Sequence, residues 1–166
     1  MDKDAYLEIN ASQRPALALF EAMGYTYISP ADCDKQCGSR YHVLLRDILR
    51  GQLRRLNRYV YAGAENEFSA ANIERAMEDL DEPLTDGLVR TSEKIYDALL
   101  LGKSYPETVG DGKMLSFNLK YIDWDNPQNN VFHVTEEFAV DSRDRQHNAR
   151  PDLSLIHISE HTRPLY

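Results

Sequence analysis

The clearest pattern of apolar and polar positions predicts a helix over residues 42–59. Its apolar residues recur three or four positions apart and form one stripe: Leu45, Ile48, Leu49, Leu53 and Leu56. This spacing is typical of a helix that buries one side. Gly51 lies inside the predicted helix, where glycine costs about 1 kcal/mol relative to alanine. We therefore expect Gly51 to mark a point of close packing.

Capping residues predict three more helices in the first 102 residues. Ser12 is expected to cap a helix that has Pro15 in its first turn and ends at Gly24. A short strand over residues 25–28 follows. Ser69 is expected to cap a helix that runs through Asp79, with Phe68 as a hydrophobic staple, and Thr85 is expected to cap another over residues 86–101. Helices therefore dominate the first half.

The second half changes to a period of two, which is typical of strands. Residues 114–122 alternate, and Leu115, Phe117 and Leu119 share one face. Residues 123–130 are rich in Asp, Asn and Pro and predict a turn. Residues 131–140 are expected to return as the partner strand of a hairpin or meander. The fold class is α/β, with a helical N-terminal half packed on a small mixed β-sheet.

Composition narrows the class of protein. The chain has 166 residues, 42% hydrophobic and 28% charged, which suits one globular domain with a real core. Its net charge of −8 excludes a protein that is basic all over, so any DNA contact must come from a local patch. The sequence shows no apolar run long enough to span a membrane and no signal peptide, so we expect a cytoplasmic location.

A row of arginines on the helix predicted over residues 42–59 is a candidate for a local basic patch. Arg46, Arg50, Arg54 and Arg58 are four residues apart and share a face. Guanidinium groups in a row are suited to following a phosphate backbone. Surface arginines commonly have no ligand, so a solvated face, here partly neutralised by the acidic segment 65–86, is the favoured alternative. Both alternatives stay open.

Two other clusters contain candidate metal ligands. Cys33, Cys37 and His42 offer zinc ligands, but the fourth ligand is missing and the spacing matches no zinc finger or ribbon. Reduced thiols are the expectation for a cytoplasmic protein. Asp123 and Asp125 flank Trp124, and two carboxylates so spaced in a turn can face one ion, although both are also ordinary turn residues.

The segment Arg150-Pro151-Asp152 carries the main candidate chemistry. Pro151 holds Arg150 extended, so Asp152 begins a strand with its carboxylate projecting. A carboxylate beside an arginine suits Mg²⁺ binding next to a phosphate, with Arg150 as a candidate phosphate contact. Either Glu136 or Glu137 is expected to reach the same end of the sheet. The alternative is that Asp152 is only a turn residue.

Four segments resemble the N-terminal endonuclease region of the R subunit of type I restriction enzymes: residues 38–50, 116–127, 130–138 and 150–152. The resemblance implies an incomplete restriction-endonuclease-like domain of the PD-(D/E)xK class, with Asp152 as its first acidic Mg²⁺ ligand. It also implies cleavage of double-stranded DNA in a complex with modification and specificity subunits. ATP would be used only in motor domains further along the family's chain.

The sequence departs from this family after Asp152. No lysine follows Lys120, and Glu160 is followed by His161 and Thr162 rather than by the lysine that the class requires. Residues 153–159 resemble the translation of a sequencing adapter, so we expect a partial nuclease domain over residues 1–152 and a non-native tail over residues 153–166.

Two expectations follow from that departure. The tail is expected to pair at most as a short edge strand over residues 153–158, with few contacts beyond. Because the second acid and the lysine are absent, the chain by itself is expected to be inactive. A non-catalytic protein-interaction module is the alternative function.

Overall fold

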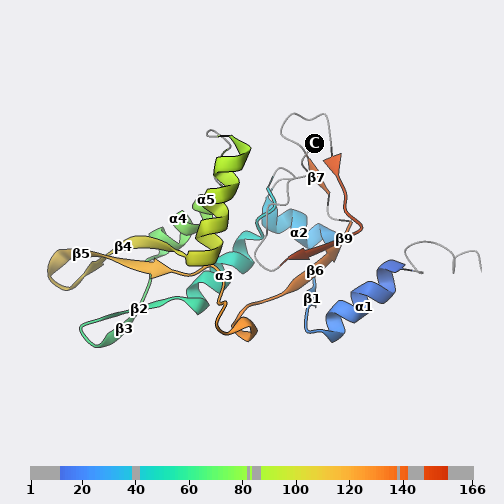
Figure 1. Cartoon of the computed structure of the whole chain (residues 1–166). Helices are drawn as coiled ribbons and strands as arrows, with labels where there is room; N and C mark the ends of the chain where they lie inside the picture. The colour runs from blue at the N-terminus through green and yellow to red at the C-terminus, as the bar shows by residue number, and fades with distance from the viewer. Residues whose placement is uncertain are drawn as a thin grey trace, which may run out of the picture. The chain divides into compact units, whose positions relative to one another are not determined.

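The computed structural model describes residues 12–38, 42–81, 83, 87–137, 139–141 and 148–156. Contacts divide the chain into two compact units: unit 1 comprises residues 1–45 with 131–166, and unit 2 comprises residues 46–130. Figure 1 labels most of the helices and strands of both units. The part of the chain that is described contains no helix long and apolar enough to cross a membrane.

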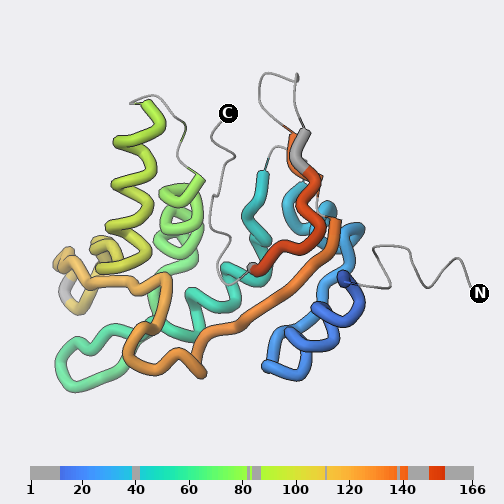
Figure 2. Tube along the Cα trace, turned by 45° about the vertical axis from the view of Figure 1, so that its right-hand side comes forward, coloured from blue at the N-terminus to red at the C-terminus, as the bar shows by residue number. Residues whose placement is uncertain are grey.

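Unit 1 is built on a small mixed sheet. Its strands are β1 (Thr26–Tyr27), β6 (His133–Glu136) and β9 (Leu153–Ile156), in the order β1-β6-β9. β1 runs parallel to β6, and β9 runs antiparallel to it. Figure 2 shows β6 in orange with the red segment that contains β9 beside it. A second, two-stranded sheet pairs β7 (Val140–Asp141) with β8 (Asn148–Ala149). The expected mixed sheet is therefore present.

Two helices accompany this sheet. α1 (Arg14–Ala22) begins after Gln13, which replaces the predicted Ser12 as the N-cap residue, and has proline in its first turn. α2 (Pro30–Cys37) was not predicted. Its start and stop follow from Ser29, whose hydroxyl accepts the N–H of Asp32, and from Gly38, which adopts a left-handed conformation.

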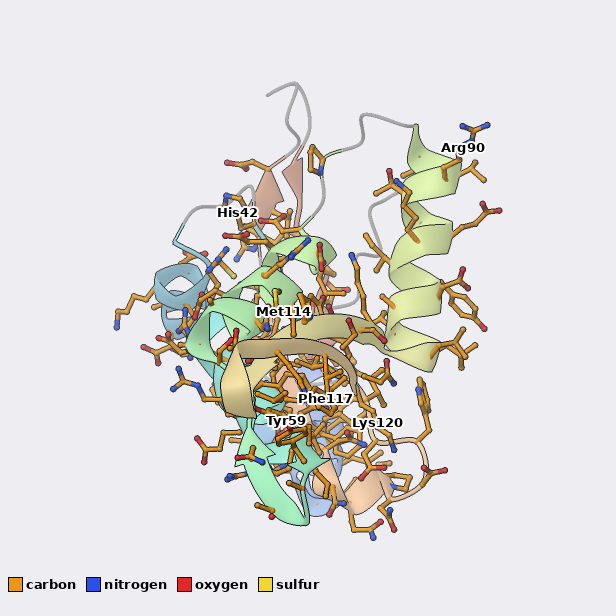
Figure 3. All side chains as sticks on the ribbon, turned by 90° about the vertical axis from the view of Figure 1, so that its left-hand side faces the viewer. His42, Tyr59, Arg90, Met114, Phe117 and Lys120 are labelled. Carbon is orange, nitrogen blue, oxygen red and sulfur yellow. The ribbon has the colours of Figure 1, made fainter. Side chains whose placement is uncertain are left out.

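Unit 2 combines three helices with two hairpins. The helices are α3 (Arg46–Leu56), α4 (Ala70–Leu80) and α5 (Leu88–Leu101). β2 (Arg58–Tyr61) pairs antiparallel with β3 (Ala64–Glu67), and β4 (Lys103–Val109) pairs with β5 (Lys113–Leu119). Two 3₁₀ turns, η3 (Gly110–Gly112) and η4 (Pro127–Asn129), complete it. The hairpins meet where Tyr59 stacks on Phe117, with ring centroids 4.3 Å apart (Figure 3).

A buried polar cluster ties α4 to the β4–β5 hairpin. The hydroxyl of Tyr105 donates to the carboxylate of Asp79 at 2.6 Å and lies 2.8 Å from the hydroxyl of Tyr121, which donates to the carbonyl of Ala76. Burial is the main cause that raises the pKa of both phenols. Around them the core consists of apolar side chains, among them Leu53, Ile73, Met77 and Leu119.

The predicted helix over residues 42–59 is wrong at both ends. α3 spans only Arg46–Leu56, and β2 begins at Arg58. The buried amide of Asn57 causes the change of direction: it donates to the carbonyls of Leu53 and Lys120 and accepts the N–H of Lys120. The prediction of close packing at Gly51 is also wrong, because a Cβ there would meet no atom within 4 Å.

The predicted pairing of residues 114–122 with residues 131–140 is wrong as well. β5 pairs with β4, and β6 pairs with β1 and β9. Alternation shows which side chains share a face, but it does not identify the partner strand.

The cap of α4 is confirmed: Ser69 accepts the N–H of Asn72 at 3.3 Å. The next helix, α5, begins at Leu88 after Gly87, and the predicted cap Thr85 lies outside the described residues. Gly102 ends α5 as predicted, with a φ of 76°, and a Cβ there would lie 2.5 Å from the carbonyl oxygen of Leu119. The close approach between α5 and β5 therefore requires glycine.

Candidate functional site

Asp152 lies directly before β9, at the end of the sheet where β6 finishes. The strand register sets Glu136 of β6 opposite Leu153 of β9, so the exposed Asp152 is next to the last residues of β6. The tail that follows forms an edge strand over Leu153–Ile156, as expected, while residues 157–166 lie outside the described residues.

Glu137 holds the Arg-Pro-Asp segment in two ways. Its backbone N–H donates to the carbonyl of Asp152 at 3.2 Å, and its carboxylate forms an ion pair with the guanidinium of Arg150. Glu137 has a φ of 48°, in the left-handed region that residues other than glycine seldom adopt. The expectation that one of the two neighbouring glutamates reaches the Asp152 end is met by Glu137.

Glu136 has a different partner. Its carboxylate accepts a hydrogen bond of 3.0 Å from the hydroxyl of Tyr27, at the end of β1. Partial burial, with the hydrogen bond and negative charge of Glu136 as lesser causes, raises the pKa of Tyr27. The sequence pattern did not predict that Tyr27 would contact this end of the sheet. Glu136, Glu137 and Asp152 therefore lie at one end of the sheet.

These carboxylates do not amount to a complete metal site. Within the described ranges, no three His, Cys, Asp or Glu side chains are grouped so as to hold a metal ion. Glu136 is engaged by Tyr27 and Glu137 by Arg150. Asp152 can supply one hard oxygen ligand, whereas Mg²⁺ is normally bound through several oxygens. No reaction step through Mg²⁺ follows from these residues.

The predicted arginine row lies in unit 2, and its members have different surroundings. Arg50 of α3 bridges two acids: its guanidinium forms a bidentate ion pair with Glu74 of α4 and a 2.7 Å contact with Asp47. The hydrogen bond from Arg50 is the main cause that lowers the pKa of Glu74, and the charges of Arg46 and Arg54 contribute.

Arg58 does not belong to the helical row. It lies on β2 and forms a 2.7 Å ion pair with Glu67 on the paired strand β3. Glu67 and Glu74 both belong to the acidic segment 65–86. Part of the row's positive charge is thus balanced within the unit. Contact of Arg46, Arg50, Arg54 or Arg58 with DNA stays a prediction.

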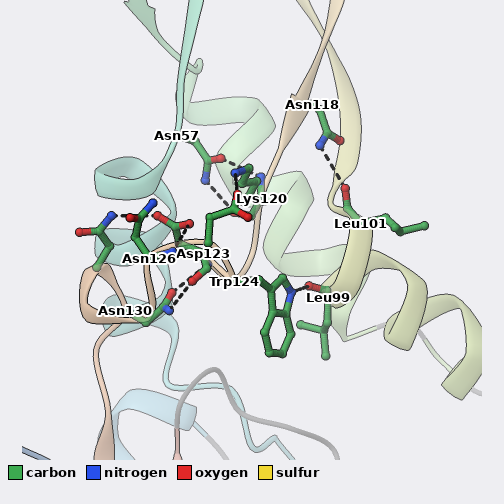
Figure 4. A network of polar contacts seen from close by, with 11 residues as sticks. Asn57, Leu99, Leu101, Asn118, Lys120, Asp123, Trp124, Asn126 and Asn130 are labelled. Carbon is green, nitrogen blue, oxygen red and sulfur yellow. Dashed lines mark hydrogen bonds and ion pairs between the residues drawn. The ribbon is translucent and has the colours of Figure 1, made fainter.

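The loop around Trp124 uses its carboxylates to hold the turn (Figure 4). Asp123 accepts the side-chain amide of Asn129 at 2.8 Å and the N–H of Asn126 at 3.2 Å. The bond from Asn129 is the main cause that lowers the pKa of Asp123. Asp125 contacts Lys120 at 3.4 Å. These contacts account for both acids as turn residues.

Cys33 and Cys37 are buried free thiols on α2. Burial is the main cause that raises the pKa of both thiols, and that of Cys37 reaches about 12. The nearby Thr135 of β6 acts in the opposite direction on the pKa of Cys33. The zinc alternative of Cys33, Cys37 and His42 finds no three-ligand group in the described part of the chain.

A family model described as "Type I restriction enzyme R protein N terminus" matches residues 5–157, most of the chain. The chain belongs to this family. The match between the type I restriction R protein family and this chain continues past Asp152 and includes β9, so the Arg-Pro-Asp segment lies within it. No curated protein and no solved structure matches.

Proposed function

We propose that this chain serves the cleavage of double-stranded DNA as the N-terminal nuclease region of a type I restriction R protein, acting in the cytoplasm with modification and specificity subunits. The observation that carries the proposal is the placement of Asp152. It lies within a family match of residues 5–157, at the carboxyl end of β6, and its backbone is held by Glu137. The PD-(D/E)xK assignment is part of this proposal.

In this function each residue of the segment has a separate role. Asp152 would supply one carboxylate to a Mg²⁺ ion, and the ion, when bound, would supply activation of water and stabilisation of charge on a phosphodiester. Glu137 orients the segment, and Arg150 contacts phosphate once its ion pair with Glu137 opens. Because the second acid and the lysine of the class are missing from the sequence, we expect the chain by itself to be inactive. ATP belongs to motor domains outside this chain.

Binding of a metal ion tests the proposal without relying on cleavage. Mn²⁺ titrated into the ¹⁵N-labelled chain should broaden the amide resonances of Glu137, Asp152 and Leu153 first, because paramagnetic relaxation falls steeply with distance. Asp152→Asn should remove this selective broadening, whereas Asp125→Asn, an exposed acid of unit 2, should not. Broadening that is uniform, or that survives in Asp152→Asn, would contradict the assignment.

Cleavage provides the second test. Incubation of the purified chain with supercoiled plasmid and Mg²⁺ should leave the plasmid intact. Cleavage that disappears in Asp152→Ala would show that other side chains complete the metal site. It would contradict the expectation that the site is incomplete.

A further inference from the structure

The paired strands of unit 1 are interrupted next to Asp152. β6 and β9 form one antiparallel ladder, and β7 and β8 form a second one (Figure 1). Glu137 follows the last residue of β6, and Arg150 follows the last residue of β8. Both therefore lie at the junction between the two ladders, together with Pro151, which has no N–H to donate to either ladder.

Glu137 closes this junction through its backbone and through its side chain. Its N–H donates to the carbonyl of Asp152 at 3.2 Å, and its carboxylate forms the ion pair with the guanidinium of Arg150. The backbone bond needs only an N–H, which every residue except proline supplies at this position. The ion pair with Arg150 is the contribution that requires a carboxylate.

The backbone at position 137 favours a different type of residue. Glu137 has a φ of 48°, in the left-handed region where a Cβ is unfavourable and which glycine adopts freely. Glycine would therefore close the junction through its N–H at a lower conformational cost. The presence of a glutamate indicates that its negative charge has a role that the turn itself does not require.

The charge of Glu137 is directed at a residue that is open to solvent. The side chains of Arg150 and Glu137 are 61% and 41% exposed, so an anion in solution can approach the guanidinium. A guanidinium binds a carboxylate and a phosphate through the same fork of N–H donors. Glu137 and a phosphate therefore compete for Arg150.

We propose that Glu137 is an autoinhibitory residue, whose carboxylate occupies Arg150 until a DNA phosphate displaces it. The inference rests on the proposed function, in which Arg150 contacts phosphate. Because an exposed ion pair is weak, it leaves Arg150 open for part of the time and lowers its affinity for phosphate by about two- to sixfold. DNA held at a high local concentration by an assembled complex binds in spite of this loss, whereas dilute DNA binds less.

Binding of a short DNA duplex to the ¹⁵N-labelled chain, without divalent cations, measures this competition. The amide resonances of Asp152 and Leu153 report on the junction itself. Glu137→Gln should bind about two- to sixfold more tightly than the parent, because the neutral amide does not hold the guanidinium by charge. Glu137→Gly should bind as tightly as Glu137→Gln, and its backbone suits the junction, so it guards against misfolding of the first variant. Unchanged affinity in both variants would overturn the proposal.

Two further variants separate competition for Arg150 from the general effect of removing a negative charge. Glu136→Gln removes the same charge one residue away, where the partner is Tyr27. It should tighten binding by less than about 1.5-fold at about 0.15 M salt, because salt screens exposed charges over about 8 Å. Arg150→Gln should weaken binding, and adding Glu137→Gln to it should have no more effect than the Glu136→Gln control.

The outcomes show which statement fails. If Arg150→Gln weakens binding but Glu137→Gln does not strengthen it, Glu137 only joins the two strands, and Arg150 keeps its proposed contact with phosphate. If Arg150→Gln leaves binding unchanged, both the autoinhibition and the phosphate contact of the proposed function are wrong. A gain in Glu137→Gln that persists without Arg150 would be a general charge effect and would also overturn the autoinhibition.

Discussion

Arg50 of α3 and Glu74 of α4 form a bidentate ion pair that links the two helices, with the Nη2–Oε2 distance at 3.1 Å. The pair is partly exposed, since the side chains of Arg50 and Glu74 are 29% and 39% exposed. Water screens such a pair, so its contribution to stability is about 1 kcal/mol or less. It joins the two helices at one point of their contact.

This ion pair predicts a dependence of stability on pH. The pKa of Glu74 is lower in the folded chain than its ordinary value, so the unfolded state binds more protons as the pH falls. The stabilisation is present above about pH 4.5 and is lost as the pH falls through the lowered pKa. Urea unfolding at pH 7 and pH 3 should show a larger difference for the parent than for Arg50→Gln. Equal differences would contradict the prediction.

A second prediction separates the two interpretations of the arginine row. If Arg46 and Arg54 form a solvated face, the double variant Arg46→Gln/Arg54→Gln should change the free energy of unfolding by less than about 1 kcal/mol. Affinity for a double-stranded oligonucleotide should stay weak and unchanged. Fluorescence anisotropy at several salt concentrations measures this. A large loss of affinity with a shallower salt dependence would identify a phosphate-binding row instead.

A third prediction concerns the buried hydroxyls of Tyr105 and Tyr121. Tyr105→Phe removes the contacts of its hydroxyl with Asp79 and Tyr121, while Asp79 keeps Lys103 and Tyr121 keeps the carbonyl of Ala76. The variant should therefore destabilise unit 2 by about 1 kcal/mol. Tyr121→Phe removes the bond to the carbonyl of Ala76 and should cost a similar amount. Chemical denaturation of the single and double variants gives the coupling, which should be about 0.5 kcal/mol or more. Purely additive losses would show that the two hydroxyls do not cooperate.

A fourth prediction follows from the buried thiols. Since the pKa of Cys37 is raised to about 12 and that of Cys33 is also raised, the folded chain should react slowly with iodoacetamide at pH 8. Unfolding should release both thiols. The sign for stability is opposite to that of Glu74: the contribution is present below the unfolded pKa and decreases as the pH rises above about 8.5. Rapid alkylation of native protein, measured by mass spectrometry, would contradict it.

The sequence predicted best those elements whose signals are local. Ser69 caps α4 because a hydroxyl needs only the N–H groups three residues ahead, and Gly102 ends α5 for an equally local reason. α2 was missed because Cys33 and Cys37 are its only buried side chains, which gives too little periodicity. The early end of α3 was also missed, because it depends on a hydrogen bond between Asn57 and Lys120, which are far apart in the sequence.

The candidate site was predictable in part. The Arg-Pro-Asp segment and a glutamate at the end of β6 could be identified as neighbours, because strand ends and proline geometry are readable from sequence. The bond between Tyr27 and Glu136 could not, since it requires that β1 and β6 run in parallel. The pairing of β5 with β4 is local, since only Gly110–Gly112 separates the two strands, and it was missed because residues 103–109 were not predicted to form a strand.

The close approach at Gly102 has a consequence for how the chain can evolve. A side chain there would collide with the carbonyl oxygen of Leu119, and backbone atoms cannot be exchanged for smaller ones as side chains can. In a library that samples every amino acid at every position, glycine at 102 should survive alone, even where neighbours on α5 vary freely. The angle between α5 and the β4–β5 hairpin should therefore be inherited almost unchanged by descendants whose surfaces have diverged.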